Sequence, residues 1–214
     1  MSHRPRDDDA VPTLQECTDM QIGADESDLV VRAQSGDQRA FEILYTRYNN
    51  KIFRYVSRMV GSDSIGCELT YDTFSRAWEG LQQLRDPERF TSWLYTIARH
   101  CVYTYQDRMK RRRWIPWVDN ESDGTMLSVS GPEAQFEESE LVRLALARVS
   151  KRYRPFVILY FMEDIPQRQI ANILGVKESI VSKYVCRGKE ELRRIYQRLN
   201  REAGGALGGK EQDA

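Results

Sequence analysis

The sequence lacks the features of membrane and secreted proteins. No apolar run approaches the length needed to span a bilayer, and the opening residues, MSHRPRDDDA, contain no apolar core like that of a signal peptide. The four cysteines are widely separated, which predicts reduced thiols that pack in the core rather than a disulfide framework. We therefore expect a cytoplasmic protein without membrane insertion.

Signals for catalysis and for cofactor binding are also missing. The chain has two histidines and four cysteines, and none of them stands at the spacing of a metal site. It contains no glycine-rich phosphate loop and no nucleophile motif, and its carboxylates are scattered as on an ordinary surface. These absences predict a protein that is not an enzyme and that has no metal site and no cofactor.

Strand signals are absent as well, because no segment sustains an alternation of apolar and polar residues. Apolar residues recur instead at steps of three and four, which is typical of helices. The sequence therefore predicts an all-α fold of two small helical domains joined by a flexible linker. The predicted parts are a disordered segment (1–26), a helical domain (27–113), an acidic linker (114–137), a second helical domain with a helix-turn-helix (138–199) and a disordered tail (200–214).

The charges are unevenly distributed, although the formal net charge is zero. Residues 28–113 carry fifteen basic and ten acidic side chains, and residues 140–199 carry thirteen and six. Residues 114–139 between them carry six acidic side chains and no basic one. Two basic blocks separated by an acidic connector predict a polyanionic partner for each domain.

The first domain is predicted to hold four helices. The first begins near Ser27 or Asp28, and Asp37 caps the second. In the third, Trp78 falls on the apolar side, and Gly66 should weaken the first turn by roughly 1 kcal/mol relative to alanine. The fourth covers about Thr91 to Arg113. In the second domain we expect helices over Glu138–Val149 and up to about Met162, and a last helix that ends near Leu199.

Residues 166–189, PQRQIANILGVKESIVSKYVCRGK, form two amphipathic segments around Gly175. Glycine readily adopts the left-handed conformation that ends a helix, so the pattern predicts a helix-turn-helix whose second helix enters a DNA major groove. The polar face of that second helix presents Glu178, Ser179, Ser182, Lys183 and Arg187. An ordinary helical hairpin remains the alternative.

The fourth predicted helix interleaves aromatic and cationic residues, among them Trp93, Arg99 and Tyr103. Cations neutralise phosphates and aromatic faces stack on unpaired bases, so this helix suits single-stranded or locally opened nucleic acid. Its basic C-terminal end has an alternative explanation, because a helix dipole also favours cations there.

Over residues 28–113 and 139–198, the chain resembles the bacterial RNA polymerase sigma factors of the extracytoplasmic-function (ECF) class. The matching segments are DLVVRAQSGDQRAFEILYTRY, FSRAWEGLQQLRDPERFTSWLYTIARH and LALARVSKRYRPFVILYFMEDIPQRQIANILGVKESIVSKYVCRGKEELRRI. The resemblance implies a sigma factor that binds core RNA polymerase and directs promoter-specific initiation through −10 and −35 recognition and −10 melting. It also implies promoter DNA as a partner, a cognate anti-sigma factor, and a linker that follows polymerase channels.

The resemblance assigns roles to residues of this chain. The region 2-like domain (27–113) would contact polymerase through Leu69, Asp72, Phe74 and Trp78, with the alternative that some of these, notably Phe74 and Trp78, belong to the core instead. It would read and melt the −10 element through Arg89, Thr91, Ser92, Arg99, His100 and Tyr103. The region 4-like domain (138–199) would read the −35 element through the five polar residues of the recognition helix named above.

Several positions depart from the family pattern. Gly66 and Gly188 stand where a small alanine is usual, His100 stands where asparagine is usual, and Pro166 and Lys177 stand where serine often caps a helix. The alternative function is a stand-alone helix-turn-helix transcriptional regulator, which would normally carry a sensor or receiver domain. A protein that only sequesters a partner is a third possibility.

Overall fold

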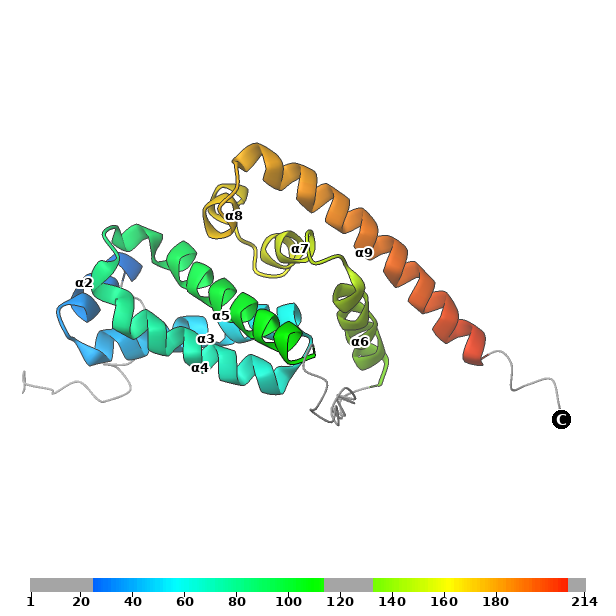
Figure 1. Ribbon diagram of the computed structural model, residues 1–214, viewed down its shortest axis with the longest axis horizontal. Coiled ribbons are helices and arrows are strands. Elements are labelled where there is room, and N and C mark those ends of the chain that lie inside the picture. The colour runs from blue at the N-terminus through cyan, green and yellow to red at the C-terminus, as the bar shows by residue number, and fades with distance from the viewer. Residues whose placement is uncertain (1–24, 114–132, 208–214) are drawn as a thin grey trace, which may run out of the picture.

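The computed structural model describes residues 25–113 and 133–207, which contain eight α-helices and two 3₁₀-helices but no strand (Figure 1). These residues form two helical halves that lie against each other, so the all-α prediction is confirmed. The predicted disordered segment up to residue 24, most of the predicted linker and the end of the predicted tail lie outside the described residues.

The first half consists of α2 (Glu26–Gln34), α3 (Gln38–Val60), α4 (Asp63–Gly80) and α5 (Phe90–Arg113). Helices α3, α4 and α5 lie side by side (Figure 1). Asp37 caps α3 as predicted, because its side chain accepts a hydrogen bond from the Ala40 N–H at 3.2 Å. Gly61, with φ 79°, ends α3, and Ser62 then caps α4. The chain therefore reverses direction over two residues.

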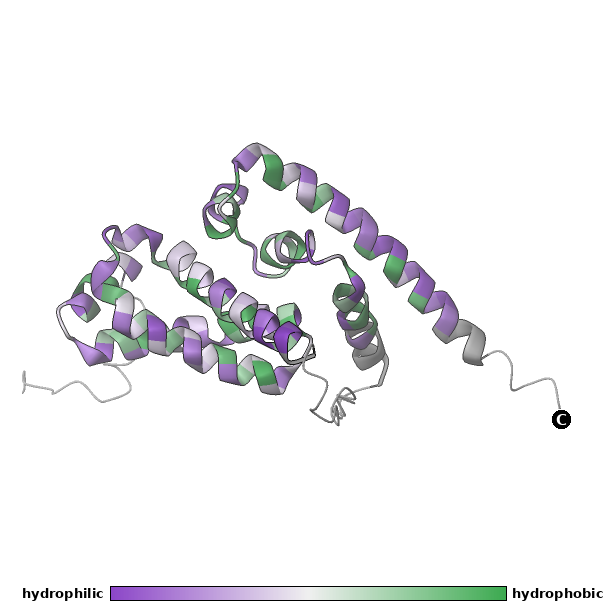
Figure 2. Ribbon diagram, in the orientation of Figure 1, coloured by the Kyte–Doolittle hydropathy of each residue, from purple (hydrophilic) through white to green (hydrophobic). Residues whose placement is uncertain are grey.

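Buried apolar residues at helical spacing hold this half together. Leu44, Ile52 and Val56 of α3 are fully buried, as are Leu94 and Ala98 of α5. Figure 2 shows apolar residues on the facing sides of the helices and polar residues on their outer sides.

The prediction that Trp78 lies in the core was wrong. Its side chain is 43 % exposed and lies at the rim of α4, where its ring packs on Phe41 with 4.8 Å between ring centroids. Periodicity marks the apolar side of a helix, but it does not tell how far the neighbouring helix covers that side.

The second half consists of α6 (Glu133–Arg148), α7 (Arg154–Phe161), α8 (Gln167–Leu174) and α9 (Glu178–Leu207). Pro155 stands in the first turn of α7, as predicted.

Two helices of the second half are longer than their predicted spans. Helix α6 begins at Glu133 rather than Glu138, because EAQFE after Pro132 consists mostly of good helix formers. Helix α9 continues past Leu199 to Leu207. Glycine disfavours a helix by about 1 kcal/mol but still makes the backbone hydrogen bonds, so the glycine pair near this end does not stop α9.

Gly66 lies where α3 and α4 cross closely. A Cβ atom at this position would lie 1.9 Å from Ser57 Oγ and 3.0 Å from Ser57 Cβ. Alanine would favour the first turn of the helix, but its Cβ atom could not be accommodated here unless the Ser57 side chain moved. Gly188 is similarly placed: a Cβ atom there would lie 2.5 Å from Val157 Cγ2 of α7. Both departures from the family pattern thus have a packing reason.

This packing predicts opposite effects for two substitutions in the same helix. Gly66→Ala should lower the free energy of unfolding by about 1–3 kcal/mol, because the added methyl group overpacks the α3–α4 contact. Gly80→Ala is the matched control, since its Cβ atom would meet Trp93 at an ordinary 3.5 Å; it should be neutral or slightly stabilising. Urea denaturation followed by circular dichroism measures both. Equal stability of the two variants would contradict the close crossing.

Candidate nucleic-acid interface

Helices α8 and α9 form a helix-turn-helix. Gly175 ends α8 with φ 67°, and the Val176 N–H donates to the Ala171 carbonyl at 3.0 Å, which closes the helix end. Ile170 of α8 and Val181 of α9 are fully buried between the two helices and α7. This arrangement rigidly presents the first turns of α9.

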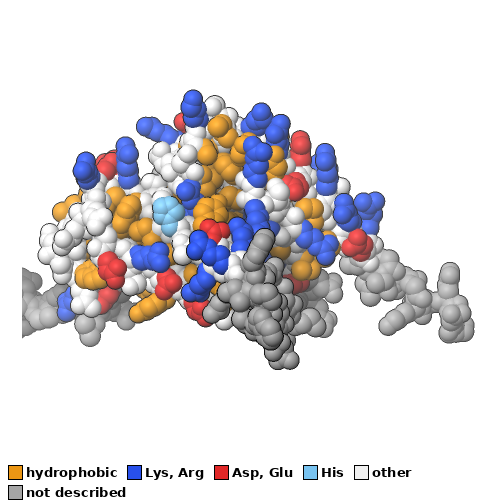
Figure 3. Space-filling model, viewed as in Figure 1, with side chains coloured by type: hydrophobic (Ala, Val, Ile, Leu, Met, Phe, Trp, Pro, Cys, Tyr) orange, Lys and Arg blue, Asp and Glu red, His pale blue; other side chains and the backbone are white. Residues whose placement is uncertain are grey.

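The face of α9 that points away from this core is polar and accessible. The five residues predicted for −35 contact are all exposed: Glu178, Ser179, Ser182, Lys183 and Arg187. In Figure 3, Lys and Arg side chains gather along the upper edge of the molecule, over α8 and α9. A projecting helix with both hydrogen-bonding and cationic side chains can enter a major groove and contact the flanking phosphates.

One further residue that sequence reasoning missed contacts this face. The Ser182 hydroxyl donates to Gln167 Oε1 at 2.5 Å. Gln167 is the first residue of α8. The polar character of Gln167 could have suggested a role. Its contact with Ser182, however, depends on how α8 and α9 cross.

The segment before α5 is held by side-chain hydrogen bonds. Gln34 Nε2 donates to the carbonyls of Leu81 at 2.9 Å and of Leu84 at 2.7 Å. A 3₁₀-helix, η2 (Pro87–Arg89), follows, capped by Asp86. Asp86 also pairs with Arg89 at 2.9 Å, with the Arg89 side chain 71 % exposed. Of the residues predicted for −10 contact, Arg89 is therefore accessible.

Thr91 and Ser92 use their hydroxyl groups inside the protein. Ser92 is buried, and its Oγ donates a hydrogen bond to the Arg89 carbonyl at 3.1 Å. Thr91 Oγ1 donates to Glu26 at 3.1 Å and lies 2.7 Å from the Tyr48 hydroxyl, which donates to the same carboxylate. Burial, together with Glu26, raises the pKa of Tyr48. These two residues order the start of α5.

The remaining −10 candidates lie along α5. His100 and Tyr103 are exposed, and the Arg99 guanidinium lies 5.6 Å from the centre of the Tyr103 ring. Arg99 itself turns toward the other half, where its Nη1 donates to the Ile173 carbonyl of α8 at 2.7 Å. One cation of the predicted −10 surface is thus bound by the other half.

The predicted polymerase-contacting residues of α4 fall into two groups. Leu69 and Phe74 are buried at 6 % and 4 % exposure and belong to the core. Asp72 and Trp78 are exposed. Tyr71 of α4, which sequence reasoning did not select, is the most exposed large apolar residue described, at 76 %.

Within residues 25–113 and 133–207, no helix combines the length and apolar character of a bilayer-spanning segment. Three of the four cysteines are described: Cys101 is buried as predicted, but Cys67 and Cys186 are exposed. The expectation of core packing was therefore wrong for these two, because both lie on outward-facing turns of their helices.

Comparison with known families assigns both halves. The family model described as Sigma-70 region 2 matches residues 44–115, and Sigma-70 region 4 matches residues 139–192. The ECF RNA polymerase sigma-E factor of Escherichia coli strain K12 is 29 % identical over 182 residues, which cover 81 % of this chain and 95 % of that protein. The ECF RNA polymerase sigma factor BldN of Streptomyces coelicolor is 30 % identical over 176 residues, 78 % of this chain and 64 % of BldN.

Two solved structures share the fold. CnrH, solved in complex with the cytosolic domain of CnrY, gives a TM-score of 0.61 at 22 % identity, covering 81 % of this chain and 97 % of CnrH. The sigma factor RpoE of Bartonella quintana, solved with the anti-sigma factor NepR, gives 0.61 at 19 % identity, with 73 % and 96 % covered.

The fold and the exposed helix-turn-helix thus define a two-part, DNA-binding protein of the sigma factor type. The two family matches, in this order, fall one in each described half. The chain belongs to the sigma-70 family of RNA polymerase sigma factors, in its ECF class, and so to the proteins that direct transcription initiation.

The geometry around Thr91 predicts a structural role for its hydroxyl group. Thr91→Val keeps the shape but removes the hydrogen bond to Glu26, so the free energy of unfolding should fall by about 1 kcal/mol. Thr104→Val, at an exposed position of the same helix, should change it by less than about 0.5 kcal/mol. Urea unfolding gives both values. Unchanged stability of Thr91→Val, with weaker binding of −10 DNA, would instead assign the hydroxyl to DNA.

Proposed function

We propose that this sigma factor recognises promoters at two points, with α9 reading the −35 element and the start and outer face of α5 reading and opening the −10 element. The observation that carries the proposal is the exposed polar face of α9, on a chain that matches region 2 and region 4 in order. Each surface alone would bind modestly, and linking them raises the affinity through local concentration.

The residues proposed for each element follow from their exposure. Glu178, Ser179 and Ser182 reach base edges in the major groove, and Lys183 and Arg187 contact bases or phosphates. At the −10 element, Arg89, His100 and Tyr103 are the accessible groups. Arg99 joins them when it leaves Ile173. An unstacked −10 base would be held by these aromatic and cationic groups, which offset the few kcal/mol that flipping costs.

Core RNA polymerase is the proposed partner of the outer face of α4. Tyr71 and Trp78 stand two turns apart on this face with Asp72 beside them, and Tyr45 of α3 adds a third exposed aromatic ring. Exposed aromatic clusters of this kind are typical of protein-binding surfaces. The protein would act in the cytoplasm without chemistry of its own, and an anti-sigma factor would be a second protein partner.

The two elements require the halves to separate. Sites named −10 and −35 lie about 25 base pairs apart, or about 85 Å along B-DNA at 3.4 Å per base pair. Residues 114–132, which join the halves, can reach about 65 Å when fully extended. Together with the size of each half, this reach suffices for simultaneous contact with both elements.

Reconstituted transcription tests the proposal. Purified protein is mixed with core RNA polymerase and a library of promoter fragments, and the transcript start sites are mapped. Initiation that depends on core polymerase and shares a two-box motif is the expected result. Tight, specific DNA binding without core polymerase, and no initiation with it, would overturn the proposal in favour of a stand-alone helix-turn-helix regulator.

The proposed −35 contacts predict the effect of two substitutions. Lys183→Ala or Arg187→Ala should weaken binding to a −35 fragment by about 1–3 kcal/mol for a base contact, or lower the salt dependence by about one ion for a phosphate contact. Arg198→Ala is the control, since Arg198 is exposed on the same helix beyond the region 4 match. Fluorescence anisotropy at several salt concentrations measures DNA binding, and polymerase binding should be unchanged. Loss of polymerase binding instead would show that this face contacts protein.

A further inference from the structure

Glu163 lies at the centre of the contact between the two halves. It follows α7, and its side chain has no exposed area. Its carboxylate accepts a hydrogen bond from Arg58 Nη1 of α3 at 2.9 Å and one from the Tyr95 hydroxyl of α5 at 3.3 Å. Arg54 Nη2 of α3 lies 3.5 Å away. One carboxylate of the second half is therefore bound by three groups of the first half.

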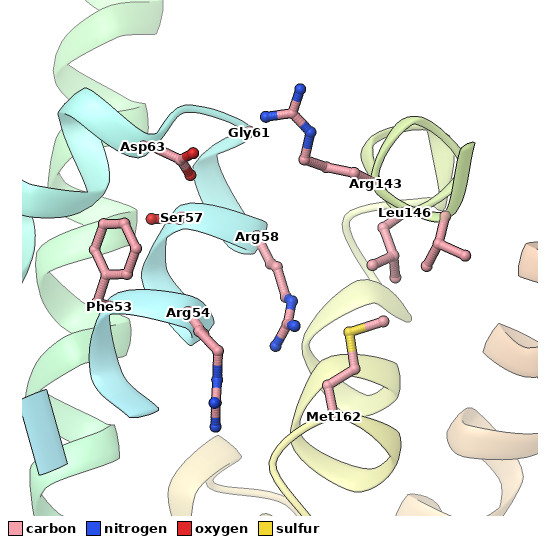
Figure 4. A pocket seen from close by; sticks show the side chains of 10 residues that line it. Phe53, Arg54, Ser57, Arg58, Gly61, Asp63, Arg143, Leu146 and Met162 are labelled. Carbon is pink, nitrogen blue, oxygen red and sulfur yellow. The ribbon is translucent and has the colours of Figure 1, made fainter. Parts of the chain in front are cut away.

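The local backbone directs Glu163 toward these partners. The next residue, Asp164, has φ 50°, and within the described residues it is the only non-glycine residue with a positive φ. The Glu163 N–H donates to the Ile158 carbonyl at 3.2 Å, and the Ile165 N–H donates to the Leu159 carbonyl at 3.0 Å. This tight turn after α7 fixes the carboxylate against α3. In Figure 4, Arg54 and Arg58 project from α3 toward the end of α7 at Met162.

Burial of the Glu163 carboxylate removes its hydration, which disfavours its charged form. Burial raises the pKa of Glu163, and the charges of Arg54 and Arg58 oppose this effect. Removing either side of a buried ion pair leaves the other charge uncompensated, so the contact is selective for a carboxylate at this position. The arginine side chains, 49 % and 29 % exposed, can turn to solvent when the pair separates. The contact can therefore open without stranding a buried cation.

Packing between the halves is incomplete beside the two arginine partners of the carboxylate. A cavity of about 520 Å³ remains between the halves, lined among others by Arg54, Arg58, Arg143, Leu146 and Met162 (Figure 4). Buried apolar residues of both halves do form one continuous cluster, but the cavity removes contacts from one end of it. The polar contact at Glu163 thus adds directional specificity to this arrangement.

The closed arrangement binds one cation of the proposed −10 surface and leaves the proposed −35 surface free. Arg99 of α5 is bound to the Ile173 carbonyl of α8, and its Nε is buried with no hydrogen-bond partner among the described residues. The polar face of α9 is exposed in the same arrangement. A cation that is incompletely satisfied in the closed state gains when it is released to a phosphate.

We propose that Glu163 is an internal latch, which binds Arg54, Arg58 and Tyr95 and holds the sigma factor in a closed, autoinhibited state in which α8 binds Arg99, one of the −10-reading groups of α5. The latch rests on the proposed function, since autoinhibition presupposes that Arg99 contacts −10 DNA. Opening the latch frees α5 and lets the halves separate along the promoter.

The distance between the halves tests the latch directly. Cys67 of α4 and Cys186 of α9 are exposed thiols in different halves, and Cys101 is buried. In a Cys17→Ser background of the full chain, spin labels on Cys67 and Cys186 report their separation by double electron–electron resonance. The wild-type protein should give a single narrow distribution of label–label distances at short range. Glu163→Gln should shift this distribution to longer distances, with the long-distance fraction raised about tenfold or more.

Asp164→Asn is the matched control. Like Glu163→Gln, it removes one negative charge, but at the next residue, which is exposed. Asparagine tolerates the positive φ of this position. Its distance distribution should equal that of wild type. The double variant Arg54→Gln/Arg58→Gln removes the contact from the other side and should reproduce Glu163→Gln, with helix content checked by circular dichroism. A short, narrow distribution in both latch variants, or a broad one in wild type, would overturn the latch.

Transcription separates failure of the latch from failure of the proposed function. At a promoter mapped as above, Glu163→Gln should reach half-maximal initiation at a concentration about threefold or more below that of wild type, and Asp164→Asn should match wild type. Opening of Glu163→Gln without any gain in initiation would overturn autoinhibition. Opening without core-dependent initiation by any variant, wild type included, would overturn the proposed function and leave Glu163 as the contact that closes the molecule.

Discussion

The contact of the Glu163 carboxylate with α3 and α5 determines how the two halves of this molecule lie. Buried apolar residues of both halves meet in one continuous cluster, so apolar contact also holds the halves together. Apolar surfaces alone would tolerate several relative positions of the halves, because hydrophobic contact is non-directional. A buried carboxylate between Arg54, Arg58 and Tyr95 has one favourable geometry, so it selects one position.

That position has unequal consequences for the two proposed DNA-reading surfaces. The polar face of α9 in the helix-turn-helix is exposed to solvent. In contrast, the Ile173 carbonyl of α8 accepts a hydrogen bond from Arg99 of the first half. The start of α5 is rigid for a separate reason, because Thr91, Tyr48 and Glu26 form a hydrogen-bonded cluster that joins three helices. A protein whose halves must separate on promoter DNA needs an ordered −10 surface and a second half that can move away from it.

Much of the helical pattern was predictable because it depends on local rules. Asp37 caps α3, Pro155 stands in the first turn of α7, and Gly175 ends α8 in the left-handed conformation, each as the sequence indicates. The exposure of Lys183 and Arg187 also follows from helical periodicity. Predictions that depend on how a neighbouring helix packs were wrong or incomplete. Trp78 lies at a rim, and Gly66 meets Ser57 across a helix crossing that no local pattern reveals.

The sequence by itself determined the helices, their order, the helix-turn-helix and the family, because capping, periodicity and motif spacing act over short stretches of chain. Tertiary structure alone decided that Trp78 lies at a rim, that Thr91 donates a hydrogen bond to Glu26, and that Glu163 contacts α3. These outcomes join residues up to 105 positions apart. Contacts at such separations depend on how preformed helices pack, and helix packing is set by the complete surfaces of both partners rather than by any one segment.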